Sequence, residues 1–444
     1  MFDKIAHFKN KVLMIMGRFN TKTFRDLANL TIWVEKSWGL ILLTISVVVF
    51  FMTTLLPSAK KITHGFAAYF TASRLVIEHR GGSIFYDDNA FQAEVTQVTH
   101  GQASDIYWAN PPTTAVMFMP LASLSIDSAR RIWTCLSLIS LVLGVVISGL
   151  VIFKTPFQTK SFFLAASVLF LSVPVAANFQ YGQAYTLIFL FYTIALFAMN
   201  SGLEWLAGSF VALALALKAS GLPLLVLLIL RGRWRIVMWV LLVFISVTLL
   251  SIPLVGLSTW RVYVFVALPN FLADPVIAAT AYQTIPSFIR HLFTYDHIWN
   301  PNPLVHWPTF ASVISLLMTI GLVGIASWRS SKTSPTQMFC LGLILSVILV
   351  PAAEQHHYVL LLPAIFFAVH SPTTPKPLLY VSAALLALSL DYTAKDFTNG
   401  GWALLAYPRL YGAILLFIAL CYHEDDILSR DVEAINIDAY SRTQ

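Results

Sequence analysis

The stretch that decides the fold is residues 38–56, WGLILLTISVVVFFMTTLL, together with the long polar stretch that follows it. The first part is an uncharged apolar run close to the roughly 20 residues that a helix needs to cross a bilayer. The second part, from Pro57 to Pro112, includes HGFAAYFTASRLVIEHRGG (64–82), FYDDNAFQAEV (85–95) and most of SDIYWANPPTTAV (104–116). A simple connector needs only a few residues, so a loop of this length predicts a functional segment.

The rest of the chain repeats the apolar pattern. Of the 444 residues, 58% are hydrophobic and 11% are charged, against about 25% charged residues in soluble domains. The sequence therefore predicts an all-α polytopic membrane protein with about eleven or twelve transmembrane helices. The predicted spans lie near residues 38–56, 132–153, 162–177, 184–199, 205–217, 222–230, 236–257, 310–328, 338–351, 358–369, 378–390 and 403–422.

Lysine and arginine predict the orientation. They concentrate in the N-terminal segment and in alternate short loops, which places these on the cytoplasmic side of the plasma (inner) membrane. We therefore expect a cytoplasmic segment 1–36, a single transmembrane domain 37–422 with outer loops 57–112 and 258–308, and a cytoplasmic tail 423–444. The net charge of +7 then reflects topology, and no basic patch predicts nucleic-acid binding. Within the first loop, we expect short interfacial helices near residues 65–78 and 90–98.

The predicted outer face gathers the ionisable groups. Most single charges at a membrane boundary are ordinary wet-loop residues. The run Glu354-Gln355-His356-His357-Tyr358 differs, because a carboxylate and two imidazoles lie between apolar runs where burial without partners is costly. A functional site and a structural hydrogen-bond network both explain this run.

Several local motifs occur in the order found in one enzyme family. They are Gly65-Phe66-Ala67-Ala68-Tyr69-Phe70-Thr71-Ala72-Ser73-Arg74-Leu75, Phe85-Tyr86-Asp87, Tyr107 to Pro112 with Pro120-Leu121-Ala122, Gly182-Gln183, Ala207-Gly208 through Lys218, Tyr282-Gln283-Thr284 with Arg290, and His356-His357-Tyr358. Together they resemble the polyprenol-phosphate-mannose-dependent mannosyltransferases of glycosyltransferase family 87, which have the membrane-embedded type C architecture. The resemblance covers roughly residues 65–368.

The resemblance implies a membrane-embedded glycosyltransferase. It would move a sugar, mannose or another hexose or pentose, from a polyprenyl-phosphate donor to a lipid- or glycan-linked acceptor at the outer face. In the family, an aspartate at the position of Gly65 is taken as the catalytic base, and glycine cannot accept a proton. The candidates for a substitute base are Glu354, Asp105 and His64.

The donor's phosphate is an anion and a leaving group. Arg74, Lys218 and Arg290 are the cations expected around it. A lipid phosphate leaves without a nucleotide, so we expect no metal and no other cofactor. Groups suited to bind the sugar or the acceptor are Tyr69, Tyr107, Asn110, Gln183, Gln283, His356 and His357; for the aromatic residues, an interfacial belt is an equal alternative.

Two other functional classes remain open. One is a transporter or flippase for a lipid-linked sugar, for which inverted repeats and ionisable groups near mid-membrane are typical. The other is a non-catalytic relative that binds lipid-linked sugar, which Gly65 favours. In all these cases the partners are lipid-linked sugars and membrane lipids, with no nucleic acid.

Overall fold

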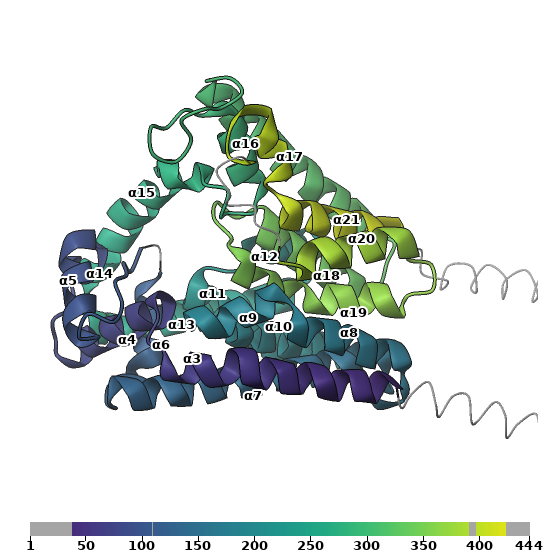
Figure 1. Ribbon diagram of the computed structural model, residues 1–444, viewed down its shortest axis with the longest axis horizontal. Coiled ribbons are helices and arrows are strands. Elements are labelled where there is room, and N and C mark those ends of the chain that lie inside the picture. Colours follow the sequence, from purple (N-terminus) through teal and green to yellow (C-terminus); the bar gives the residue numbers. More distant parts are fainter. Residues whose placement is uncertain (1–37, 109, 390–396, 423–444) are drawn as a thin grey trace, which may run out of the picture.

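The computed structural model describes residues 38–108, 110–389 and 397–422, which fold almost entirely into helices (Figure 1). The described residues form no β-strand, and an isolated bridge pairs Asp296 with Asn300. The all-α fold class is therefore confirmed. The terminal segments 1–36 and 423–444 lie outside the described residues, so the prediction that both are cytoplasmic stays a prediction.

Five helical stretches among the described residues are long and apolar enough to cross a membrane. A sixth is the pair α8 (Lys160–Leu171) and α9 (Val173–Tyr181), which is bent by 45°. The five are Trp38–Ile77, α7 (Ile126–Phe153), α13 (Trp234–Val255), Leu257–Ala278 and α17 (Pro308–Ser330). Large apolar side chains cover their outward sides, for example Leu250 at 73% exposure and Phe265 at 76%. Such surfaces suit a hydrocarbon environment, and the chain is a multi-pass membrane protein.

The other predicted spans form shorter helices. Pro174, Pro223 and Pro363 each stand in the first turn of a new helix, where a missing N–H costs nothing. The shorter helices are α10 (Tyr185–Asn200), α11 (Glu204–Lys218), α12 (Leu222–Leu230), α18 (Pro335–Ile348), η6 (Gln355–Leu361), α19 (Leu362–His370), α20 (Lys376–Ala387) and α21 (Pro408–Tyr422).

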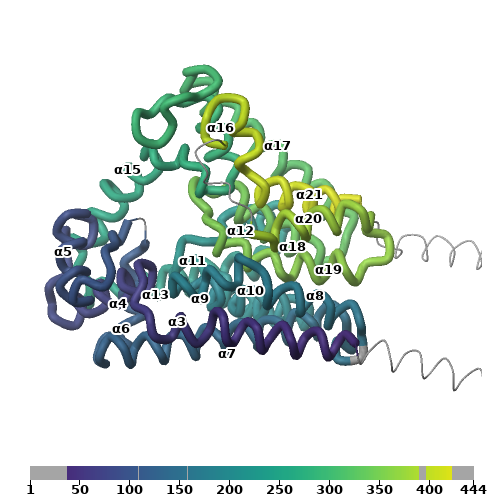
Figure 2. The backbone as a smooth tube through the Cα atoms, in the orientation of Figure 1, coloured from purple at the N-terminus to yellow at the C-terminus, as the bar shows by residue number. Residues whose placement is uncertain are grey.

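Close helix packing holds the amino-terminal half together. The first helix, residues 38–50 with its continuation η1 (Phe51–Leu55) and α3 (Leu56–Lys60), runs beside α7 (Figure 2). Helix α11 packs between α10 and α13. A side chain at Gly208 would bring its Cβ within 2.5 Å of the Ile236 carbonyl oxygen and of Trp239 Cβ. The absence of that side chain lets α11 approach α13 closely.

The first long loop contains the two predicted helices. They are α4 (His64–Ile77) and α5 (Asp88–Val98), joined through η2 (Ser83–Tyr86), and α6 (Pro112–Ala122) follows the loop. Helix α4 buries nearly all its side chains against α6 and neighbouring elements, and the interfacial position of the two helices stays a prediction. Ser73 ties the two helices, since its Oγ donates to the Ala115 carbonyl oxygen at 2.7 Å.

The second long loop extends α13 outward. It contains α14 (Leu257–Val262), η4 (Tyr263–Ala267), α15 (Leu268–Ala273), η5 (Pro275–Ala278) and α16 (Ile285–Phe293). Trp108 joins the two loops, because its ring lies 4.7 Å from that of Phe271 and 5.9 Å from that of Tyr282. The carboxyl-terminal helices α18 to α21, with η8 (Gly400–Leu405), lie above α8 to α10 in Figure 1. One hydrophobic cluster runs from Phe50 to Leu420.

Candidate functional site

The site is built around the end of helix α11. Ala219 adopts left-handed φ and ψ and stops the helix directly after Lys218. Two hydroxyls of α6 bind the last carbonyls of α11: Thr113 donates to the Ala216 carbonyl oxygen, and Thr114 donates to that of Leu217 at 2.6 Å. The segment after Asp105 thereby holds the backbone that carries Lys218.

Lys218 faces two aromatic rings and two acids. Its ammonium lies 4.8 Å from the ring centre of Tyr69 and 5.8 Å from that of Tyr185, within cation–π range. Its charge acts on both Asp105 and Glu354. Within the described part of the chain, neither carboxylate forms a direct ion pair with Lys218. The cation and the two acids therefore act on one another through their charges without direct pairing.

Burial changes the acidity of both carboxyls. Burial raises the pKa of Asp105 to about 7; the Ile106 backbone N–H, which donates to Asp105 at 2.9 Å, and the charge of Lys218 oppose this rise. Burial also raises the pKa of Glu354, again against the charge of Lys218. A carboxyl with a pKa near neutrality is suited to general-base catalysis, because it is partly ionised at the working pH and holds a proton well.

The two histidines lie against Glu354 and Tyr185. His356 Nδ1 is 3.7 Å from Glu354 Oε2, and the His357 ring stacks 4.0 Å from the ring of Tyr185. Asn178 Nδ2 donates to the His356 carbonyl oxygen at 2.7 Å and fixes this turn to α9. In the described structure, Nδ1 of each histidine is buried without a hydrogen-bond partner. This arrangement fits both predicted alternatives. Close packing fits a structural hydrogen-bond network, and the unpaired Nδ1 atoms of the two histidines fit a functional site.

Gly65 lies against another predicted site residue. The Tyr69 hydroxyl donates to Gln183 Oε1 at 2.5 Å. A Cβ on Gly65 would lie 2.5 Å from Gln183 Nε2 and 2.6 Å from the Tyr181 carbonyl oxygen. The space that a side chain at position 65 needs is therefore taken by the Gln183 carboxamide and by backbone.

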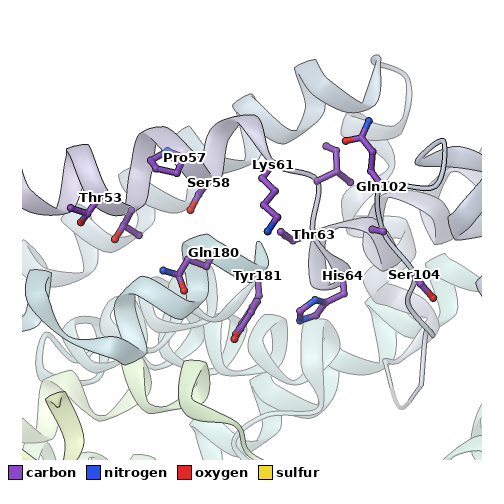
Figure 3. A pocket seen from close by; sticks show the side chains of 13 residues that line it. Thr53, Pro57, Ser58, Lys61, Thr63, His64, Gln102, Ser104, Gln180 and Tyr181 are labelled. Atoms are coloured by element: carbon purple, nitrogen blue, oxygen red, sulfur yellow. The ribbon is translucent and has the colours of Figure 1, made fainter. Parts of the chain in front are cut away.

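His64 lies at the border of a cleft. Its ring packs 4.7 Å from that of Tyr181. The cleft beside it has a volume of about 560 Å³ and extends from the end of the first span to Ser104, the residue before Asp105 (Figure 3). His64 thus borders this cleft, and its charge also acts on His356 of the cluster.

The three predicted phosphate cations lie in different surroundings. Lys218 belongs to the cluster above. Arg74 is exposed, and its Nε donates to Glu78 at 2.9 Å within the first loop. Arg290 donates to the carbonyl oxygens of Leu272 at 2.7 Å and Asp274 at 3.3 Å. Their convergence on one phosphate stays a prediction, and within the described residues Lys218 is the one of the three that acts on the acid pair.

Three predicted sugar-binding residues make contacts inside the protein. The buried Tyr107 packs against Phe85 and donates to the Pro111 carbonyl oxygen at 3.1 Å. Asn110 Nδ2 donates to the Tyr107 carbonyl oxygen at 2.6 Å. Gln283 Nε2 donates to the Thr280 and Ala406 carbonyl oxygens at 2.7 and 2.8 Å, and its Oε1 accepts from the Arg409 backbone N–H at 3.1 Å. These contacts hold the loop and the carboxyl-terminal helices in place.

Sequence reasoning missed two residues of the site. Tyr185 lies beside Lys218 and His357. Its position two residues after Gln183, in the Gly182-Gln183 motif, could have indicated it from the sequence. The buried Arg130 orders the turn before Gln183, since its Nη2 donates to the Phe179 carbonyl oxygen at 2.6 Å and its Nε to that of Lys61 at 3.0 Å. An arginine pair, Arg130-Arg131, directly before an apolar run is the pattern that could have found it.

The chain is similar in sequence to known proteins. The sequence model of Glycosyltransferase family 87 matches residues 108–351. The chain is 24% identical over 279 residues to a polyprenol-phosphate-mannose-dependent alpha-(1-2)-phosphatidylinositol pentamannoside mannosyltransferase of Mycobacterium tuberculosis (strain CDC 1551 / Oshkosh), covering 60% of this chain and 59% of the relative.

A second relative has a similar name. It is a polyprenol-phosphate-mannose-dependent alpha-(1-2)-phosphatidylinositol mannoside mannosyltransferase of Mycobacterium tuberculosis (strain ATCC 25618 / H37Rv), 23% identical over 271 residues, which are 57% of this chain and 60% of the relative. The chain thus spans about three fifths of the length of these relatives. No solved structure matches it.

Proposed function

The chain belongs to glycosyltransferase family 87, and from this premise we propose that it transfers a sugar from a polyprenyl-phosphate donor to a lipid- or glycan-linked acceptor at the outer membrane face. The proposed sugar is mannose, another hexose or a pentose. The names of the two relatives support mannose. The observation that carries the proposal is the group of Lys218, Asp105 and Glu354 beside the rings of Tyr69 and Tyr185.

Lys218 is the proposed contact of the donor phosphate. In the transfer, the acceptor oxygen forms a bond to the sugar's anomeric carbon, the bond from that carbon to the phosphate oxygen breaks, and polyprenyl phosphate leaves with the electron pair. A cation beside the leaving oxygen stabilises the charge that develops there. The absence of a direct ion pair between Lys218 and either acid within the described chain supports this role, because the ammonium keeps donors for a ligand.

Asp105 is the proposed acceptor base. It would take the proton that the acceptor hydroxyl loses during the attack, and its pKa of about 7 suits that task. Glu354 is the second candidate; His356, 3.7 Å from it, is placed to hold its orientation. His64, which borders the cleft, is the third candidate. The filled space at Gly65 supports a base outside the family's usual position.

The test is turnover of polyprenyl-phosphate mannose by the purified full chain in membrane vesicles. We expect Lys218→Met to weaken donor binding by about 2–5 kcal/mol, as loss of a buried charge contact does, while Lys332→Met, in a predicted cytoplasmic loop, leaves it unchanged. Arg74→Ala and Arg290→Ala in the same assay test the three-cation prediction. Unchanged donor affinity in Lys218→Met would contradict the proposed phosphate contact.

The base is tested separately. Asp105→Asn should lower kcat more than Glu354→Gln or His64→Ala, with little change in donor affinity. Wild-type rates in all three variants would overturn the base assignment.

The blocked space at position 65 also favours a second candidate, a non-catalytic protein that binds lipid-linked sugar. This candidate predicts donor binding that depends on Lys218 without turnover of any polyprenyl-phosphate sugar by the wild-type chain. Turnover by the wild type, abolished in Asp105→Asn, would exclude it.

A further inference from the structure

The cleft beside His64 has an unusual set of lining groups. Its wall comes from the end of the first span, the residues between α3 and α4, the stretch before Asp105, and the end of α9 (Figure 3). The lining residues are Thr53, Thr54, Pro57, Ser58, Lys61, Ile62, Thr63, His64, Gln102, Ala103, Ser104, Gln180 and Tyr181. Hydroxyls, amides and one ammonium are present and no carboxylate is, so the cleft is rich in donors and suits an anion.

Two of the hydroxyls lack partners. Ser58 is 3% exposed, and in the described structure neither its Oγ nor Thr63 Oγ1 has a hydrogen-bond partner. Buried hydroxyls are normally paired, so both point to a ligand that supplies acceptor oxygens. Figure 3 shows the Ser58 hydroxyl and the Lys61 amino group directed into the same space.

Helix α4 adds a third favourable feature. Thr63 is its N-cap, yet its hydroxyl does not bind the first turn. The helix has fourteen residues and begins at the cleft wall. The positive end of the helix dipole and its free N–H groups favour an anion at this place.

Exposed apolar side chains neighbour the cleft. The segment that forms one wall, η1 and the start of α3, exposes Phe51, Met52 and Leu56. These residues belong to the helical stretch Trp38–Ile77, which is apolar enough to span the membrane. A molecule with its anionic group in the cleft could therefore keep its hydrocarbon chains along the first span.

We propose that this cleft binds the phosphate group of a membrane lipid through Lys61, Ser58 and Thr63. Lys218 is not among the residues that line this cleft, whose wall includes the His64–Tyr181 pair. The cleft would give the protein a second phosphate-binding site besides Lys218. Its role in catalysis rests on the proposed function, whereas phosphate binding itself does not. Because the cleft reaches Ser104, beside Asp105, a lipid held there would present its headgroup to the proposed base.

The test measures binding, so it can fail independently of turnover. The full-length protein in detergent is titrated with short-chain phosphatidylglycerol, with polyprenyl phosphate and with inorganic phosphate. We expect Lys61→Ala and Ser58→Ala to weaken binding of at least one of the two lipids about tenfold or more, and Lys61→Arg to restore most of it. Lys60→Ala is the matched control, because Lys60 is the neighbouring exposed lysine and does not line the cleft.

The two lipids distinguish the source of the phosphate. A loss confined to phosphatidylglycerol assigns the cleft to a phospholipid, and a loss confined to polyprenyl phosphate assigns it to the donor lipid. A loss for inorganic phosphate alone, wild-type affinity for both lipids in Lys61→Ala and Ser58→Ala, or an equal loss in Lys60→Ala would overturn the proposal.

Discussion

Replacing Gly65 by alanine should destabilise the protein, because the added methyl group would make two contacts that are too close. In Gly65→Ala, the new Cβ meets Gln183 Nε2 at 2.5 Å and the Tyr181 carbonyl oxygen at 2.6 Å. The amide can swing away, whereas the carbonyl is part of the backbone and can yield less. Moving the amide breaks the 2.5 Å hydrogen bond that Gln183 accepts from the buried Tyr69 hydroxyl.

The magnitude follows from these two effects. Overpacking a close contact costs about 1–3 kcal/mol, and leaving a buried hydroxyl unpaired costs about 1–3 kcal/mol more. The better helix propensity of alanine offsets about 0.5–1 kcal/mol. The net destabilisation is thus about 1–5 kcal/mol. It should appear as a lower Tm of the purified protein in detergent.

A matched control and a second substitution test whether the contact with Gln183 causes the destabilisation. Gly321→Ala, in α17, meets nothing within 4 Å and should leave Tm unchanged or raise it slightly. In a Gln183→Gly background, the cost of Gly65→Ala should shrink by about 1 kcal/mol or more, because the two sites are in contact. An unchanged Tm in Gly65→Ala, or full additivity with Gln183→Gly, would refute the reasoning that the carboxamide fills the position of the family's aspartate.

Three further results are expected. The pKa of Asp105 is raised from 3.8 to about 7 on folding, so its contribution to stability is complete below about pH 4 and is lost as the pH rises through about 7. The ionised base needed for turnover appears over the same rise in pH. Asp105→Asn should flatten the pH profiles of both stability and turnover, and an unchanged pH–rate profile would argue against this base. Cysteines placed at Asp88 and at Lys332 should react with an impermeant label from opposite sides of the membrane, and same-side labelling would contradict the topology. Gly208→Leu should lower Tm by separating α11 from α13 and should also weaken donor binding through displaced Lys218; a fall in neither quantity would show that this packing does not position the site.

The sequence was sufficient for features that depend on local composition. A long uncharged apolar run such as residues 38–56 favours the bilayer wherever its neighbours lie, so membrane helices follow from hydropathy alone. The breaks at Pro174, Pro223 and Pro363 were equally readable, because proline lacks the N–H that a continuing helix needs. The family resemblance was also carried by short motifs along the chain.

The side chains that share a site depended on packing between distant segments. Arg74 and Lys218 are both cations at predicted outer boundaries. Arg74 pairs with Glu78 in its own helix turn, whereas Lys218 acts on two acids from a helix end whose last carbonyls accept from Thr113 and Thr114. Likewise, no pattern around Gly65 indicates that a glutamine 118 positions later occupies the missing side chain's space.

Membrane insertion is therefore determined by the sequence itself, because the free energy of transferring an apolar run is summed over neighbouring residues. The surroundings of Lys218, Asp105 and Gly65 were decided by tertiary structure, because burial, close contact and charge interaction act between atoms that are near in space but far apart along the chain.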